Sequence, residues 1–305
     1  ILVFSTIPKK LFEKYPEKIL RIAKAVEAGG NVAGESFLGN LEEEQWLVFN
    51  KLPRDLFEKY PEELTRMAEA IGKGARWAFE ELQKDFFEER FDDIQKIEEE
   101  YNLELYGRYR TDTLEYLYNN IGKRTEAKTK VLVILSKFDS TGAFFGDKEL
   151  YGGVINNNME LRIIEAGNET EFIELAEKMN NRYGPFGIII IGGPGKPTKI
   201  RLGVGGDESN FLDITDSEVI KRLQPIIEKD GDLVLMACST GDPNTTGNIA
   251  KTLSKKLGIT VFAPDKPADI RTIYYKQGEK GEFRVKGVEY TAESIKYEKG
   301  KRIGY

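Results

Sequence analysis

The sequence predicts an α/β protein in which a mostly parallel sheet is flanked by helices. Three observations support this fold class. The first third of the chain has helical hydrophobic periodicity, the middle alternates apolar runs with amphipathic segments, and the end has the pattern of β-hairpins. We therefore expect an all-helical domain over residues 1–125, an α/β domain over residues 130–265 and a small C-terminal β extension over residues 266–305.

An internal repeat organises the helical part. The sequence IPKKLFEKYPE at residues 7–17 returns as LPRDLFEKYPE at residues 52–62, 45 residues later. In each copy the second proline can occupy the first turn of a helix, where its missing N–H costs nothing. Apolar residues then follow at helical spacing. The repeat is typical of a short helical-repeat module, which is either a docking surface or, as we favour, a cap on the neighbouring domain.

From residue 131 the pattern alternates between strand and helix. Continuous apolar, β-branched runs predict five buried strands, at residues 131–135, 161–165, 187–191, 233–237 and 260–263. Amphipathic segments predict helices at residues 170–179, 216–229 and 246–257. Thr215 or Asp216 could cap the second of these helices. In the extension, strands at residues 272–275 and 283–285 flank a GEKG turn.

Composition limits the classes of function. The 305 residues carry a net charge of −6 with both signs interspersed, which argues against a nucleic-acid footprint. No apolar run approaches the length of a membrane span. With one cysteine and no histidine, we expect no disulfide, no metal and no cofactor. The expected partner is a protein or peptide, with no nucleic acid and no membrane, and a homo-oligomer is an open alternative.

The N-terminus limits what can be said of location. The chain begins with Ile1 rather than Met, so we expect a processed or incomplete N-terminus. Its apolar start, ILVF, is too short for a signal peptide and neither shows nor excludes export. A soluble protein, with the cytoplasm as the favoured compartment, is the expectation.

Three loops follow the predicted strands, at residues 136–147, 192–197 and 238–244, where doubly wound sheets place their ligands. The second contains a glycine-rich run, but Ile190 stands where a Walker A motif needs its first glycine, and Pro197 replaces the hydroxyl residue. We therefore expect no nucleotide site there. The LGVGG sequence that follows is interpreted as a turn between short strands.

Cys238, the only cysteine of the chain, directly follows the fourth predicted strand. The next helix is expected to begin close behind it, and thiols near helix N-termini ionise more readily than free cysteine. That placement is typical of a nucleophile. A buried, inert cysteine is the alternative, and position alone does not decide between the two.

Residues 131–264 resemble the caspase-like cysteine peptidases, which include caspases, gingipains, clostripain and separases. The resemblance rests on the order of three segments: DSTGAF at residues 139–144, ACSTG at residues 237–241 and VFAP at residues 261–264. It covers under half of the chain. It implies a caspase-like fold in which Cys238 is the nucleophile of a cysteine endopeptidase and the backbone N–H groups of Gly195 and Cys238 bind the oxyanion.

The sequence departs from that family at the catalytic base. Relatives carry Gly-His-Gly-x-Pro after the third strand, whereas this chain reads GPGKP, with Pro194 at the histidine position. General acid–base assistance contributes roughly 10²–10⁴-fold, so a poor peptidase is predicted. We favour a degenerate peptidase, a pseudoenzyme that serves as an interaction or scaffold module. The alternatives are an endopeptidase using another acid or base (Asp139, Asp213 or Lys196), a gene that differs at codon 194, and a structural assembly subunit.

Two acidic residues are candidates for substrate binding. Asp139 and Asp242 lie in loops at the expected site and would suit a basic P1 residue. Both also fit turn and capping positions, which is the role we favour.

Overall fold

The computed structural model describes residues 111–138 and 148–303, together with residues 93, 96, 97, 99–101 and 103. The chain divides into two compact units, and almost all of these residues belong to the second. The repeat at residues 7–17 and 52–62 and the DSTGAF segment at residues 139–144 lie outside the described residues.

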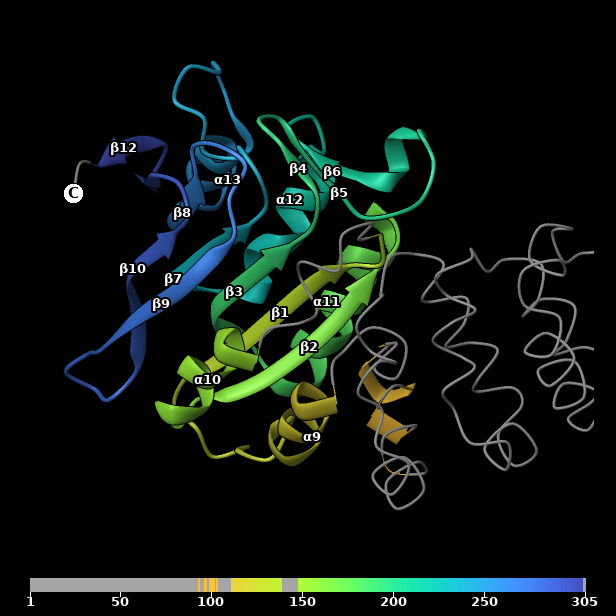
Figure 1. Cartoon of the computed structure of the whole chain (residues 1–305), viewed down its shortest axis with the longest axis vertical. Helices are drawn as coiled ribbons and strands as arrows, with labels where there is room; N and C mark the ends of the chain where they lie inside the picture. Colours follow the sequence, from red (N-terminus) through yellow and green to blue (C-terminus); the bar gives the residue numbers. More distant parts are fainter. Residues whose placement is uncertain are drawn as a thin grey trace, which may run out of the picture. The chain divides into compact units, whose positions relative to one another are not determined.

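A mixed sheet of seven strands runs through the described unit in the order β12-β11-β8-β7-β3-β1-β2 (Figure 1). Its strands are β1 (Lys130–Ser136), β2 (Glu160–Ala166), β3 (Phe186–Gly192), β7 (Ile227–Met236), β8 (Thr260–Pro264), β11 (Ser294–Glu298) and β12 (Lys301–Ile303). The first five are mutually parallel. In chain order they are arranged 2-1-3-4-5, one of the two common orders of doubly wound sheets.

The sequence predicts these five strands correctly because their side chains are buried on both faces of the sheet. Every residue of β2 and β3 is buried, as are all but the first of β1. A strand in that environment has a continuous apolar run instead of alternation. Only β7 differs appreciably, because it begins at Ile227, well before the expected residue 233.

Helices lie on both faces of the sheet, and a hairpin shares one of these faces (Figure 1). The helices are α9 (Thr111–Asn120), α10 (Lys148–Asn156), α11 (Glu169–Tyr183), α12 (Ser217–Leu223) and α13 (Ile249–Leu257). Helices α11, α12 and α13 pack side by side. Right-handed crossovers place α10 on the opposite face, where it contacts β9 (Ile270–Gln277). The partner of β9, β10 (Phe283–Tyr290), lies against β3, β7 and β8.

Two predicted helices are shorter than expected. The helix predicted for residues 216–229 ends at Leu223 and continues only as a 3-10 turn, Gln224–Ile226, because Pro225 has no N–H for the helical ladder. The helix predicted from residue 246 begins at Ile249, since Gly247 has a positive φ of 72°. Asp216 does occupy an N-cap position, but its carboxylate makes no capping hydrogen bond.

The C-terminal extension contains the predicted hairpin and then joins the main sheet. Strands β9 and β10 pair in antiparallel fashion around the turn at residues 278–281. Beyond them, β11 pairs antiparallel with β8, and β12 pairs antiparallel with β11. Within the described residues, no helix has the length and apolar character needed to cross a membrane.

A buried polar cluster lies at the β2 edge of the sheet. The Arg162 guanidinium on β2 donates to the Glu160 carboxylate over 2.7 Å and stacks on the Tyr183 ring at 3.7 Å from its centroid. It also donates to the Tyr101 hydroxyl. Arg162 and Glu160 are only 2% and 1% exposed, so each charge depends on the other for its compensation.

Candidate functional site

The loops after β3 and β7 meet at the carboxyl edge of the sheet. Because these strands are parallel neighbours, the Gly193 N–H donates to the Met236 carbonyl oxygen over 3.2 Å. A methyl group placed on Gly195 would lie 2.6 Å from the backbone nitrogen of Cys238 and 2.5 Å from its carbonyl oxygen. Only glycine allows two backbones to approach this closely. The structure therefore brings Gly195 and Cys238, both predicted as site residues, into direct contact.

Pro194 lies in the same loop and is partly exposed. Its carbonyl oxygen accepts a hydrogen bond from the Arg201 N–H at 2.9 Å. The next residues form β4 (Gly195–Lys196), which pairs with β5 (Lys199–Arg201), itself paired with β6 (Phe211–Asp213). The glycine-rich run is thus part of a small antiparallel sheet, and LGVGG is the predicted turn between β5 and β6.

Cys238 is a partly exposed free cysteine. Within residues 111–138 and 148–303, neither its thiol nor its backbone N–H has a hydrogen-bond partner. The residue is partly exposed at this edge of the sheet, and both groups are free of hydrogen bonds to the described residues.

The turn after Cys238 is held by backbone hydrogen bonds to the end of β8. Ser239 has a φ of 58°, a left-handed conformation that costs a non-glycine residue on the order of 1 kcal/mol. Its N–H donates to the Lys266 carbonyl oxygen at 3.1 Å, and the Gly241 N–H donates to that of Pro264 at 2.9 Å. These bonds keep the strained turn in place.

Two buried side chains that the sequence did not identify also hold this turn. The Asn248 amide donates to the Asp242 carbonyl oxygen and to the Tyr297 hydroxyl, each at 2.8 Å. Its oxygen caps α13 by accepting from the Lys251 N–H at 2.8 Å. An asparagine just before a helix is a cap that sequence reasoning could have found. Tyr297 is far away in sequence, on β11, and had no such signature.

The remaining candidates do not converge on the thiol. The Asp242 carboxylate accepts from the Asn244 N–H at 2.9 Å and from the Thr245 hydroxyl at 2.8 Å, and these bonds hold its pKa below the ordinary value. The Asp242 carboxylate therefore stabilises the turn in which it lies. Asp213 likewise accepts from Thr215, and Lys196 is exposed on β4. Neither is joined to Cys238 by an ion pair or hydrogen bond in the described part of the chain. Asp139 lies outside the described residues.

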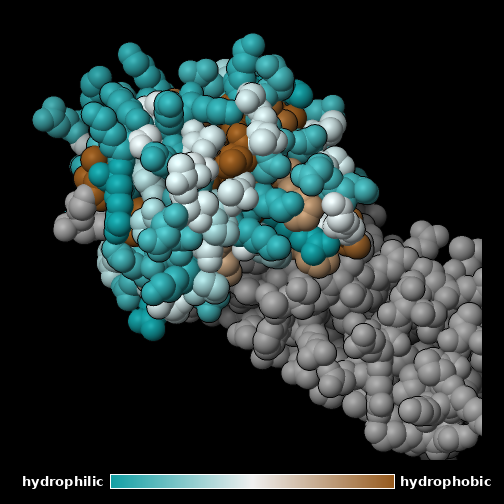
Figure 2. All heavy atoms as spheres, turned by 90° about the horizontal axis from the view of Figure 1, so that it is seen from above, coloured by the Kyte–Doolittle hydropathy of each residue, from teal (hydrophilic) through white to brown (hydrophobic). Residues whose placement is uncertain are grey.

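The adjacent strands β1 and β3 form the switch point of the sheet, the place where doubly wound proteins bind ligands. Just beyond β1, the Arg201 guanidinium stacks on the Phe138 ring at 3.8 Å from its centroid. It also donates to the Gly203 and Gly205 carbonyl oxygens. Seen from above, the described surface is mostly hydrophilic with small apolar patches (Figure 2).

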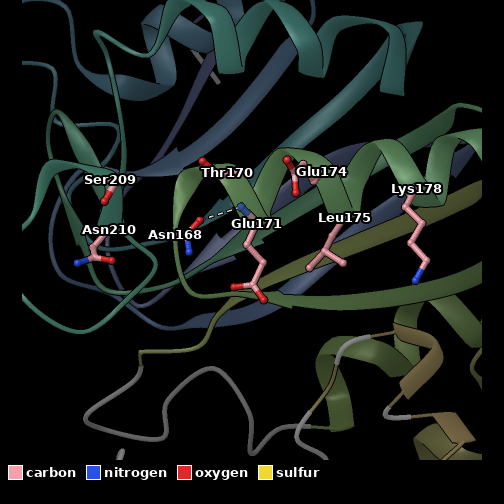
Figure 3. A pocket seen from close by; sticks show the side chains of 8 residues that line it. All are labelled: Asn168, Thr170, Glu171, Glu174, Leu175, Lys178, Ser209 and Asn210. Carbon is pink, nitrogen blue, oxygen red and sulfur yellow. Dashed lines mark hydrogen bonds between the residues drawn. The ribbon is translucent and has the colours of Figure 1, made fainter.

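A separate hollow of about 650 Å³ lies along α11 (Figure 3). It is lined by Asn168, Thr170, Glu171, Glu174, Leu175, Lys178, Ser209 and Asn210. Several of its polar groups are already committed. Glu171 binds the Lys137 ammonium and the Gly167 N–H, both at 2.6 Å, and Asn168 caps the helix. The hollow contains none of the predicted site residues. The side chains of Glu171 and Asn168 in its lining already form hydrogen bonds within the protein.

Metal-binding clusters are absent from the described part of the chain. Among the described residues, no group of three or more cysteine, aspartate or glutamate side chains is placed to hold a metal ion.

A family model matches part of the chain. Residues 159–282 match the model described as a domain of unknown function (DUF8616). The matched segment extends from just before β2 to the turn between β9 and β10 and contains Pro194, Gly195, Cys238 and Asp242. No curated protein has a sequence that matches the chain at a significant level.

Proposed function

We propose that this unit is a degenerate caspase-like cysteine peptidase, which binds peptide or protein segments at the Cys238 turn without efficient hydrolysis. The observation that carries the proposal is the contact between Gly195 and the backbone of Cys238, in a loop whose histidine position holds Pro194. This is the arrangement that the family resemblance implies for nucleophile and oxyanion donors, without the base. The loops that carry the two residues follow β3 and β7, which are parallel neighbours in the sheet.

The missing base limits the chemistry at two points. Peptide hydrolysis by a cysteine requires removal of the thiol proton before attack on the carbonyl carbon, and later protonation of the leaving amine. A proline side chain can neither accept nor donate a proton, and the chain has no histidine. A peptide carbonyl could still be bound by backbone N–H groups, which do not depend on the base. Binding would then persist where turnover fails.

The test compares turnover in the wild type with three variants, using fluorogenic peptides with basic, acidic and small P1 residues. We expect the wild type and Cys238→Ala to give the same background rate. Pro194→His should raise turnover by about 10²-fold, since it supplies a general acid and base. Pro194→Ala is the matched control, because it removes the ring without adding an imidazole.

Two results would contradict the proposal. Wild-type turnover that Cys238→Ala abolishes would establish an active endopeptidase, an alternative favoured by the partly exposed, unpaired thiol. Failure of each peptide, coupled to agarose, to retain the wild-type protein would remove the binding function.

A further inference from the structure

A cluster of exposed lysines lies away from the Cys238 turn, where α13 meets the turn between β11 and β12. We call it the basic face. Its members, all exposed, are Lys251, Lys255, Lys256, Lys299 and Lys301. The chain as a whole carries a net charge of −6, so this face opposes the overall sign.

The basic face is assembled by tertiary contacts. The Gly300 N–H donates to the Ser254 hydroxyl of α13 at 3.1 Å. The two segments touch so closely that a methyl group on Gly300 would lie 2.8 Å from Cβ of Lys255. Lys299 and Lys301 flank that glycine, so the backbone of both residues lies beside the C-terminal end of α13. Lys251 lies one helical turn before Lys255 on the same side of α13.

These lysines are not neutralised within the described part of the chain. None of the five forms an ion pair with a described carboxylate, and the Lys256 ammonium donates only to the Ser217 hydroxyl, at 2.7 Å. Glu293, by contrast, pairs with Arg302 at 2.9 Å. One carboxylate, Glu298, stands in the same hairpin, opposite Lys301 in the register of β11 and β12. Positive charge therefore predominates on this face.

Local structural roles explain only part of the cluster. Lys255 and Lys256 lie in the last turn of α13, where cations interact favourably with the helix dipole. Lys301 also protects an edge strand against unwanted pairing, as edge lysines commonly do. Neither reason accounts for Lys251 or Lys299, or for the convergence of two segments that are distant in sequence.

We propose that the basic face binds an acidic, extended segment of a partner protein. The positive charge of the face favours a negatively charged partner. The small size of the face limits the length of the segment that it can bind. Lys251 and Lys255 are about 6 Å apart along the helix. The adjoining turn adds little to that length, so the face fits only a few residues of an extended chain. A long polyanion such as duplex DNA would extend beyond it onto an acidic protein. A second copy would place like charges opposite one another.

The test uses a fluorescein-labelled deca-glutamate peptide and fluorescence anisotropy with the full chain. We expect saturable binding that weakens as salt rises from 50 to 200 mM, because exposed charges are screened. The triple variant Lys255→Gln/Lys299→Gln/Lys301→Gln should bind at least about tenfold more weakly, at a few-fold per exposed pair. The variant Lys276→Gln/Lys280→Gln/Lys286→Gln, on the β9–β10 hairpin, is the matched control and should bind like the wild type.

Each other outcome overturns the proposal. Equal weakening in both triple variants would show general charge attraction instead of a site. Tighter binding of a 20-base-pair duplex, or of phosphatidylserine vesicles, through the same three lysines would assign the face to nucleic acid or membrane. A dimer that the first triple variant dissociates would assign it to a second copy. The result is independent of the proposed peptidase-like site, since Cys238→Ala should bind the peptide as the wild type does.

Discussion

Asp232 lies on β7 beneath the β9–β10 hairpin and is 5% exposed. Its carboxylate accepts a hydrogen bond from the Val285 N–H at 2.8 Å, and Arg284, Lys296 and Lys276 contribute favourable positive charge. Burial opposes these interactions and prevails, because a charged carboxylate loses its hydration beneath the hairpin. It raises the pKa of Asp232 to about 6.

The sign of the pH dependence follows from that shift. The unfolded carboxyl has a pKa of about 3.9, so between these two values the unfolded chain ionises while the folded protein holds its proton. The free energy of unfolding contributed by Asp232 therefore falls as pH rises from about 4 to 6 and is lowest above 6. Between pH 4.5 and 7.5 linkage gives a loss of about 2 kcal/mol from this residue.

The test is Asp232→Asn, which keeps an oxygen for the Val285 N–H and removes the titration. Urea unfolding followed by far-UV circular dichroism at pH 4.5 and 7.5 gives both free energies of unfolding. Relative to the wild type, we expect the variant to gain about 2 kcal/mol between the two pH values. Any fixed cost of burying the amide cancels in that difference. Asp230→Asn, at an exposed position of the same strand, is the control and should follow the wild type. Parallel pH dependence in wild type and Asp232→Asn would refute the argument from desolvation.

Two further predictions concern packing and buried charge. Gly195→Ala should lower the free energy of unfolding by about 1–3 kcal/mol, because its methyl group overlaps backbone atoms of the turn after β7. Gly206→Ala is the control: its methyl group meets no atom within 4 Å, so the free energy of unfolding should change by less than about 0.5 kcal/mol. Equal melting temperatures for the two glycine variants would contradict this. Arg162→Met should lower the free energy of unfolding by about 3–5 kcal/mol, since Glu160 is left charged and buried. Arg222→Met breaks an exposed ion pair and should change the free energy of unfolding by at most about 1 kcal/mol. Chemical denaturation of both arginine variants checks the contrast, and a small loss in Arg162→Met would show that Glu160 finds another partner.

Much of the core was predictable because local patterns encode it. A strand buried on both faces needs apolar residues at every position, and β1 and β3 show such runs. Strand β11 was not predicted, because SIKYE is short and partly charged, and its pairing partner β8 is distant in sequence. The end of α12 also has a local signal, because Pro225 has no N–H for the helical ladder.

For the candidate site too, some features follow from the sequence and others only from the tertiary structure. The sequence alone determined that Cys238 follows a buried strand, that Gly195 follows the preceding one and that no imidazole is available to either. Only the tertiary structure decided that the two backbones touch, because their approach depends on β3 and β7 being neighbours in the sheet. It also decided that Tyr297 joins Asn248 behind the turn. Residue type and local periodicity are properties of short segments, whereas contacts between distant segments depend on how the whole sheet is ordered.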